Sequence, residues 1–278
     1  MTKRDLHRII FAALGEDQYR RDITTHLTVS AHHVSRARIF TKEGCTVCGL
    51  AVVQAIFKKL DPSIRVRLRC SDGDSVKRNT TVAEIHGKTR AILTGERTAL
   101  NFLSHLSGIA TLTRRYVRTL KPYRTKILDT RKTTPGLRLL EKWAVRCGGG
   151  ENHRMDLSDM VMLKDNHRLT ERKGTSLAET VRRIKRQTRK KIIVEVDNLN
   201  QFREILPTGA DIILLDNFPV GKIKKAVILK KKSRSRAMLE ASGGITLDNI
   251  RRIAATGVER ISVGALTHSA THIDFSLE

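Results

Sequence analysis

The strongest constraint on the fold is a regular alternation of two kinds of segment in the second half of the chain. Short apolar stretches, typical of buried strands, alternate with longer segments in which apolar residues recur at helical spacing. The predicted strands are residues 126–129, 160–163, 191–196, 211–215, 237–239 and 260–263, and the predicted helices are residues 177–187, 199–206, 220–230 and 247–255. Strands that alternate with helices in this way are parallel and are joined by right-handed crossovers, so we expect a barrel or an open sheet.

The residues at the ends of these strands favour a barrel. Charged or glycine-rich sequence closes every predicted strand: Thr130-Arg131-Lys132, Lys164-Asp165-Asn166-His167, Glu195-Val196-Asp197, Asp216-Asn217, Ser242-Gly243-Gly244 and Gly264-Ala265. A (β/α) barrel builds its active site from the carboxyl ends of its strands, whereas an open sheet gathers functional residues at one switch point. We therefore predict an α/β protein with a barrel of about six units.

The first third of the chain has a different pattern. Residues 37–40, 64–69 and 82–86 alternate apolar and polar side chains, which is typical of antiparallel strands with one covered face. Residues 6–14 and 50–60 have helical periodicity, and residues 22–25 form a turn or capping segment. A strong helix at residues 96–106 is expected to end at Ser107-Gly108, which makes this the hinge between a small α+β domain, residues 1–108, and the barrel, residues 109–267.

The charge of the chain points to acidic ligands or partners. The 53 lysine and arginine residues against 28 acidic ones give a net charge of +25. Aromatic residues make up only 4% of the chain, which leaves little material for the base-stacking surfaces of proteins that bind single-stranded nucleic acid. The basic stretches at residues 182–191, 222–232 and 251–252 are expected to form solvated outer faces, and non-specific adhesion to nucleic acid is the alternative.

The chain is expected to be cytoplasmic. The apolar run at residues 9–14 is too short for a signal peptide, and no stretch approaches the ~20 apolar residues that span a bilayer. Cys45 and Cys48 have the spacing of a redox or zinc motif, but no second pair of ligands follows at a similar spacing. We interpret them, with Cys70 and Cys147, as ordinary thiols.

Cationic residues follow the first two predicted strands of the barrel. The cluster consists of Arg131, Lys132, His153, Arg154 and Lys164. Arginine offers a planar fork for a carboxylate, and lysine acts as a point charge. A ligand with two carboxylates and phosphates would account for so many cations, although a solvated surface accounts for any single one.

Two carboxylates and two glycine loops complete the set of candidate site residues. Glu195 and Asp216 end neighbouring strands, where they could meet Mg²⁺ carried by a polyphosphate or stabilise positive charge on a substrate. Salt bridges to nearby cations are the alternative. The loops Ser242-Gly243-Gly244 and Ser262-Val263-Gly264-Ala265 offer backbone N–H groups to a phosphate, although either loop alone could be a plain turn.

Together these motifs resemble the quinolinate phosphoribosyltransferase family. The resemblance rests on TRKTTPGLR (residues 130–138), GGGENHR (148–154), KDNH (164–167), EVD (195–197), LDN (215–217) and SGGI (242–245), with GERTALNFLSHLSGIAT (95–111) similar to the interdomain helix of the family and DFSLE at the C-terminus also fitting. It covers almost the whole chain in order. Each motif is weak alone, but the set is specific.

The resemblance implies an N-terminal α/β sandwich domain, to which residues 268–278 return, and an incomplete α/β barrel. It implies transfer of phosphoribosyl from phosphoribosyl pyrophosphate (PRPP) to quinolinate, with Mg²⁺, giving nicotinate mononucleotide, pyrophosphate and CO₂. By position, Arg131, His153, Arg154 and Lys164 would bind quinolinate, Lys132 and Lys164 would meet the donor, Glu195 and Asp216 would face the ribose and Mg²⁺, the two glycine loops would hold the 5′-phosphate, and Arg97 would reach the site of the partner subunit in a homodimer.

Three alternatives remain open. One is a related enzyme with altered specificity, such as nicotinate phosphoribosyltransferase. Another is the related barrel protein associated with molybdenum transport, which is expected to lack the intact segments Asn152-His153-Arg154 and 164–167 that are present here. The third is a basic binding protein on an inactive barrel, which predicts the loss of Glu195, Asp216 or the glycine loops, all of which are retained.

Overall fold

The computed structural model describes residues 2–169 and 175–278. The chain divides into two compact units. The first unit contains residues Met1–Arg114, Thr133–Gly149 and Ala265–Glu278, and the second contains Arg115–Lys132 and Gly150–Gly264. In the part of the chain that is described, no helix is long and apolar enough to cross a membrane.

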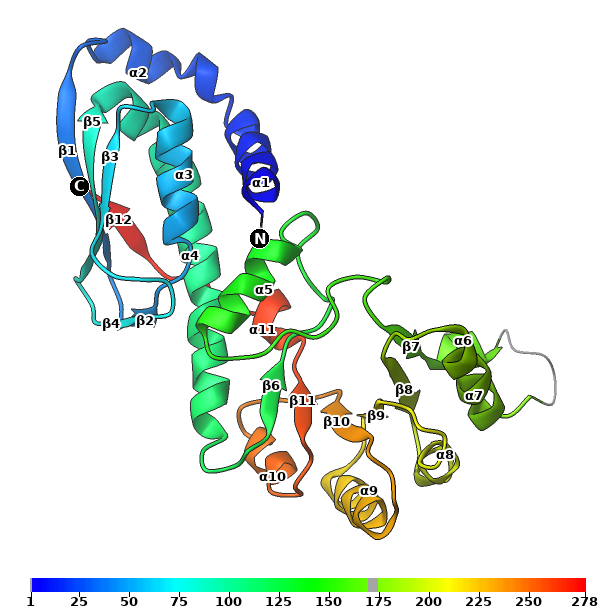
Figure 1. Ribbon diagram of the computed structural model, residues 1–278. Coiled ribbons are helices and arrows are strands. Elements are labelled where there is room, and N and C mark those ends of the chain that lie inside the picture. Colours follow the sequence, from blue (N-terminus) through cyan, green and yellow to red (C-terminus); the bar gives the residue numbers. More distant parts are fainter. Residues whose placement is uncertain (1, 170–174) are drawn as a thin grey trace. The chain divides into compact units, whose positions relative to one another are not determined.

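The first unit is built on a four-stranded antiparallel sheet, as the alternating sequence predicted (Figure 1). The strands lie in the order β12 (Phe275–Leu277), β1 (Val34–Thr41), β5 (Thr81–Lys88) and β3 (Arg65–Leu68), and the short strands β2 (Cys45–Thr46) and β4 (Ser75–Val76) pair separately. The helix α3 (Leu50–Leu60) has the predicted bounds and buries Val53, Ile56 and Phe57. Its packing against β3 and α1 (Lys3–Glu16) covers the apolar side chains.

Two N-terminal predictions need adjustment. Helix α1 extends beyond the predicted residues 6–14 because the Thr2 side chain caps it by accepting the backbone N–H of Asp5. The expected turn at residues 22–25 is instead the start of a helix, α2 (Ile23–Thr28). Asp22 is its N-cap and accepts the N–H of Thr25, so the capping role was assigned correctly. A one-turn 3₁₀ helix, Tyr19–Arg21, precedes it.

The predicted end of the long helix at Ser107-Gly108 is wrong. Helix α4 runs without interruption over Thr89–Thr119. Gly108 serves close packing here, because a Cβ on it would lie 2.1 Å from the carbonyl oxygen of Thr271. Ser107 also has a tertiary role, since its hydroxyl accepts the backbone N–H of Cys48 at 3.0 Å. Both residues therefore contact neighbouring segments and do not end the helix.

The second unit contains a parallel six-stranded sheet in the order β6-β11-β10-β9-β8-β7 (Figure 1). The strands are β6 (Lys126–Leu128), β7 (Val161–Leu163), β8 (Ile192–Val196), β9 (Ile212–Asp216), β10 (Met238–Ser242) and β11 (Arg260–Ser262). Because the first strand lies beside the last, the sheet curls as a barrel does. Among residues 2–169 and 175–278 no ladder joins β6 to β7, so the barrel is incomplete, as expected.

An extended segment lies beside β6 at the open seam. The N–H of Glu151 donates to the carbonyl oxygen of Ile127 at 2.8 Å, and the N–H of Asp129 donates to that of Glu151 at 3.2 Å. Leu128 and Glu151 form an isolated parallel bridge. These bonds fix the path of residues 151–154, which carry two of the predicted site residues.

The crossover helices agree in part with the predicted pattern: three lie close to predicted ranges, one is shorter than the predicted residues 247–255, and one was not predicted. They are α6 (Asp165–Leu169), α7 (Leu177–Gln187), α8 (Leu199–Ile205), α9 (Val220–Lys232) and α10 (Ile250–Ala254), while α5 (Arg138–Cys147) and α11 (Ala265–His268) belong to the first unit. Strand β10 extends to Ser242, beyond the predicted residues 237–239. The prediction ended at Leu239 because the charged Glu240 breaks the apolar pattern, but Glu240 is buried within the strand. Ile193, Ile212 and Leu214 form an apolar core with methionines packed against them.

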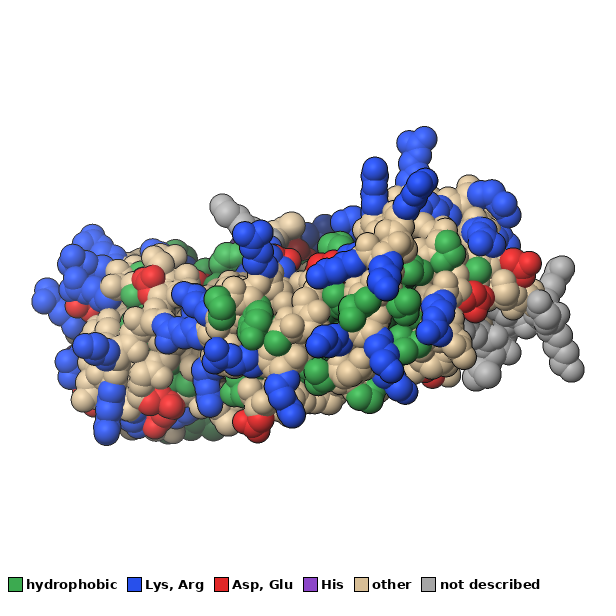
Figure 2. Space-filling view, turned by 90° about the horizontal axis from the view of Figure 1, so that it is seen from below, with side chains coloured by type: hydrophobic (Ala, Val, Ile, Leu, Met, Phe, Trp, Pro, Cys, Tyr) green, Lys and Arg blue, Asp and Glu red, His purple; other side chains and the backbone are tan. Residues whose placement is uncertain are grey.

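The basic stretches form exposed helix faces, as predicted. Arg182, Arg183 and Lys185 on α7 and Lys224 and Lys225 on α9 are exposed, as are Arg251 and Arg252 on α10. Figure 2 shows lysine and arginine side chains spread over the visible face rather than gathered in one patch. Such dispersed charge is typical of a solvated surface.

Candidate active site

The strand ends of the second unit gather most of the predicted site residues at one edge of the sheet, because parallel strands present all their carboxyl ends together. The register pairs Ser242 with Asp216, and Ser262 with Leu128. Leu163 pairs with Val194, so Lys164 and Glu195 are the next residues along their two strands.

His153 is held in one orientation by contacts on both sides of its ring. Its backbone N–H donates to Oδ1 of Asp129 at 2.8 Å, and its ring Nδ1 accepts the backbone N–H of Arg154 at 2.7 Å. Since Nδ1 accepts a proton donor, the neutral ring carries its own proton on Nε2. Nε2 lies 3.2 Å from Oε1 of Glu240. The contact with Arg154 therefore determines which nitrogen of His153 can donate.

Glu240 is a fully buried carboxylate between two cationic or polar partners. Its Oε2 accepts Nε–H of Arg260 at 2.8 Å, while its Oε1 faces His153. Burial raises the pKa of Glu240, but the nearby His153 ring and the charge of Arg260 outweigh it and lower that pKa below the ordinary value. Glu240 is therefore ionised, and its carboxylate contacts the ring of His153.

Arg131 and Arg154 form an electrostatically unfavourable pair. Arg154 is buried to 7% exposure, and its Nη1 donates to the carbonyl oxygen of Met160 at 3.3 Å. Burial is the main reason that the pKa of Arg154 is lowered, and the nearby positive charge of Arg131 lowers it further. Two guanidinium groups that repel each other in a poorly solvated place are suited to bind an anion between them.

Lys164 and Glu195 form an ion pair at the ends of β7 and β8. Nζ of Lys164 lies 2.7 Å from Oε2 of Glu195. The lysine side chain is 41% exposed and the glutamate side chain 10% exposed, so the lysine faces solvent and the carboxylate is more deeply set. A substrate that reaches Lys164 must share this pair or replace one of its contacts.

The loop after β10 is shaped by a glycine that no other residue could replace without movement. Gly243 has φ +90°, and a Cβ on it would lie 2.0 Å from Oδ1 of Asn217. Asn217, itself at φ 52°, donates from its side chain to Oδ2 of Asp216 at 2.7 Å and from its backbone to the carbonyl oxygen of Ser242 at 2.8 Å. The ends of β9 and β10 are therefore joined by hydrogen bonds, which fix the position of Asp216.

The loop after β11 is less open to a ligand than its sequence suggested. Ser262 is buried, and the N–H of Val263 donates to the carbonyl oxygen of Leu128 at 2.9 Å. Gly264 and Ala265 are partly exposed, and Ala265 begins α11. The N–H groups of this loop are thus only partly available to a phosphate.

Two further predicted site residues are at the surface. Arg97 is exposed on α4, within the first unit. Lys132 is exposed, and its backbone N–H donates to Oγ1 of Thr130 at 3.0 Å.

Glu240, Arg260 and Asp129 support the site but are absent from the predicted site residues. The available signal was a charged residue inside an apolar strand, because a buried carboxylate needs partners. The sequence order gave no indication that His153 would be the partner of Glu240.

The carboxylates fit a magnesium ion brought by a substrate better than one held by the protein alone. Glu195 is paired with Lys164, and one oxygen of Asp216 accepts from Asn217. In the described part of the chain, no group of three or more metal-ligand side chains lies at the strand ends. Mg²⁺ commonly uses one or two carboxylates together with substrate phosphates and water, and Glu195 and Asp216 match this arrangement.

A parallel barrel whose strand ends carry clustered cations, carboxylates and a glycine with positive φ is typical of a (β/α)-barrel enzyme that acts on anionic substrates. The chain belongs to the quinolinate phosphoribosyltransferase family. Residues 22–107 match the N-terminal domain of quinolinate phosphoribosyl transferase, and residues 109–278 match its C-terminal domain.

Similar proteins match this chain over nearly its whole length. The chain is 41% identical over 95% of its length to a probable nicotinate-nucleotide pyrophosphorylase [carboxylating] of Synechocystis, of which it covers 89%. It is 40% identical over 100% of its length to a protein of the same description from Bacillus subtilis, covering 94%. The crystal structure of NadC from Streptococcus pyogenes aligns with a TM-score of 0.94 at 39% identity, covering 100% of this chain and 97% of the other.

Proposed function

We propose that this enzyme transfers the phosphoribosyl group of PRPP to quinolinate and releases pyrophosphate and CO₂ to give nicotinate mononucleotide, in the biosynthesis of NAD. The observation that carries the proposal is the cluster of Arg131, His153 and Arg154, together with the Lys164–Glu195 pair at the carboxyl ends of the same sheet. Quinolinate has two adjacent carboxylates, and two mutually repelling guanidinium groups with a fixed histidine donor match that charge. Full-length similarity to proteins named for this activity supports the same assignment.

The first role of the protein is to orient quinolinate. In the proposal, Arg131, His153 and Arg154 bind its carboxylates, so that the ring nitrogen faces the anomeric carbon of the donor. Positioning two reactants in this way removes much of the entropic barrier to their reaction. The contact of Nδ1 with the backbone N–H of Arg154 holds the imidazole, so that Nε2–H can donate to the substrate.

The carboxylates act on the donor. As the ring nitrogen attacks, the bond from the anomeric carbon to pyrophosphate breaks and positive charge develops on the ribose. Glu195 and Asp216 stabilise that charge, and Lys132 and Lys164 bind the departing pyrophosphate. Bound Mg²⁺ would supply further neutralisation of the pyrophosphate charge. The loops Ser242–Gly244 and Ser262–Ala265 hold the 5′-phosphate.

Decarboxylation follows from the charge of the new ring nitrogen. The carboxylate next to the cationic nitrogen leaves as CO₂, its bonding electron pair stays on the ring carbon, and a proton from solvent then takes its place. The protein contributes orientation, through the arginines that hold the second carboxylate.

The direct test is incubation of the protein with quinolinate, PRPP and Mg²⁺, with chromatographic detection of nicotinate mononucleotide. We expect product only when all three are present, and far less product when nicotinate replaces quinolinate. Equal turnover of nicotinate would favour the related nicotinate-specific enzymes, and the absence of product would contradict the proposal. Withdrawal of Mg²⁺ with a chelator tests the metal requirement in the same assay.

We further propose a cytoplasmic homodimer in which Arg97 enters the partner's site. Its exposure on α4 supports this role, and the four free thiols are typical of a reducing compartment. Mixing inactive Arg97→Ala and Lys164→Ala proteins would then restore activity to about a quarter of the wild-type value, because half of the dimers are mixed and each mixed dimer has one intact site. Light scattering measures the dimer, and no recovery on mixing would refute the exchange.

A further inference from the structure

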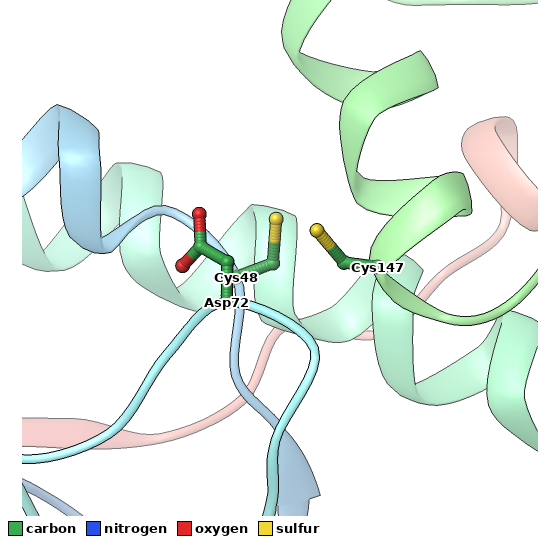
Figure 3. Close-up of side chains that lie close together, drawn as sticks. All are labelled: Cys48, Asp72 and Cys147. Carbon is green, nitrogen blue, oxygen red and sulfur yellow. The ribbon is translucent and has the colours of Figure 1, made fainter.

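The first unit brings together two thiols and a carboxylate from three distant segments. Cys48 lies between β2 and α3, Asp72 lies in the loop between β3 and β4, and Cys147 is the last residue of α5. Their two sulfur atoms and a carboxylate oxygen all lie within 4.8 Å of one another. Figure 3 shows the two sulfurs turned toward each other, with the carboxylate of Asp72 beside Cys48.

The surroundings hold Asp72 in place. Its Oδ1 accepts the backbone N–H groups of Gly49 and Leu50, both at 3.0 Å, at the start of α3. Its Oδ2 accepts Nε1–H of Trp143 at 3.2 Å. Contacts of this kind commonly orient a metal ligand from outside the coordination sphere.

A positive charge adjoins the cluster. Nη2 of Arg114 donates to the carbonyl oxygens of Gly73 and Cys147, at 2.9 and 3.0 Å. It therefore joins the loop that carries Asp72 to the end of α5. Two thiolates, a carboxylate and a dication leave one net negative charge, which the guanidinium of Arg114 is placed to balance.

Without a bound metal, the pair of thiols is poorly suited to nucleophilic or redox catalysis. Cys48 is completely buried and Cys147 is 9% exposed. A hydrogen bond to Cys147, burial and the charge of Asp72 raise the pKa of Cys48 well above its ordinary value. Reactive cysteines have the opposite environment, with a low pKa and open access.

We propose that Cys48, Asp72 and Cys147 bind one thiophilic dication of the zinc type, with water as the fourth ligand. Two sulfurs and an oxygen are a donor set that Zn²⁺ accepts in tetrahedral geometry. Zn–S bonds of about 2.3 Å and Zn–O bonds of about 2.0–2.2 Å place such ligand atoms about 3.5–3.8 Å apart, so the three side chains need to close by roughly an ångström at most.

A disulfide explains the cluster less well. It would use only the two sulfurs and would not account for the Asp72 carboxylate lying within 4.8 Å of both. Cys45, the partner that spacing along the chain suggested for Cys48, points elsewhere, with its thiol 3.8 Å from Oγ1 of Thr41. Bound metal would tie the β2–α3 loop, the β3–β4 loop and α5 together, and would stabilise the folded first unit.

The test measures Zn²⁺ binding by the reduced full-length protein after removal of metals by a chelator, in a buffer containing excess Mg²⁺. We expect one tightly bound Zn²⁺ per chain by elemental analysis, and a sulfur-to-metal charge-transfer band when Co²⁺ replaces Zn²⁺. Cys48→Ser and Cys147→Ser should each lose both signals. Cys45→Ser and Cys70→Ser are matched controls that should keep them, and Trp143→Phe should weaken binding by about tenfold.

Several outcomes would overturn the proposal, and none depends on catalytic activity. They are the absence of stoichiometric Zn²⁺ on the reduced wild-type protein, retention of Zn²⁺ by both Cys48→Ser and Cys147→Ser, and formation of a Cys48–Cys147 disulfide in air by a protein that binds no metal when reduced. Circular dichroism of each variant shows whether a lost signal reflects lost ligands or lost folding. The wild-type measurement decides the question even if a variant does not fold.

Discussion

Lys164 and Glu195 face each other across neighbouring strands, with Nζ of the lysine 2.7 Å from Oε2 of the glutamate. In the protein without substrate, Lys164 is therefore paired with the carboxylate that we propose faces the ribose. In the proposed mechanism, substrate binding changes this ion pair, so donor binding affects whether the Glu195 carboxylate is free to face the ribose. The ion pair holds the two side chains against each other at the strand ends.

Replacing Lys164 by alanine should reduce kcat/KM by about 10²–10³-fold, because a charged group aimed at the leaving pyrophosphate is lost. Steady-state kinetics with both substrates measures the effect. Lys190→Ala removes an exposed lysine before β8 and serves as the matched control, which should leave the kinetics unchanged. A Lys164→Ala enzyme with near-normal kcat would contradict the role given to this residue.

Replacing Arg131 by alanine should weaken quinolinate binding about 10–100-fold while changing PRPP binding much less. The estimate follows from the loss of a charge-assisted hydrogen bond, worth about 1.5–3 kcal/mol. Calorimetric titration with each substrate separately gives the two affinities. Arg252→Ala, on the exposed face of α10, is the control. A larger loss for PRPP than for quinolinate would mean that the two pockets have been exchanged.

Glu240 should make stability depend on pH in the acid range. Its folded-state pKa lies below the ordinary value of 4.5, so the unfolded chain binds the proton more readily at this residue. Its contribution is therefore complete above about pH 4.5 and is lost as the pH falls through the lower folded-state pKa. Thermal unfolding of wild type and Glu240→Gln from about pH 7 to about pH 3 should show a difference that narrows toward acid. A constant difference would show that the charge of Glu240 is unimportant.

Replacing Gly243 by alanine should destabilise the loop after β10 by about 1–3 kcal/mol and weaken PRPP binding. The cause is twofold: a φ of +90° that disfavours a side chain, and a Cβ position 2.0 Å from Oδ1 of Asn217. Gly221→Ala in α9 is the contrasting control, since a Cβ there has no atom within 4 Å and alanine favours helix. Denaturant unfolding and PRPP titration measure the two effects. Equal stability of the two variants would refute the strain argument.

The sequence predicted the repeating architecture well because apolar periodicity is a local property. All six barrel strands lie where the periodicity placed them, and α3 has the predicted bounds. The error at Ser107-Gly108 arose because a glycine in a helical pattern can serve either termination or close packing. Only the tertiary contact with Thr271 distinguishes the two.

The supporting residues were harder to predict because their partners are remote in sequence. Glu240 is paired with His153 and Arg260, and Cys48 lies near Cys147 rather than pairing with Cys45. The spacing of residues along the chain gives no information about such pairs. The strand-end rule predicted which charged residues would gather at one edge of the sheet, but it gave no information on the residues that support them.

The open seam between β6 and β7 has a consequence for the dynamics of the second unit. β9 and β10 have ladder partners on both sides, whereas β6 borders the seam with only the bridge between Leu128 and Glu151. Amide hydrogen exchange should therefore be slowest in the middle of the sheet and fastest along the seam. His153 follows the bridge segment on one side and Lys164 follows β7 on the other. A substrate held by both residues, as we propose, would link the two margins of the seam.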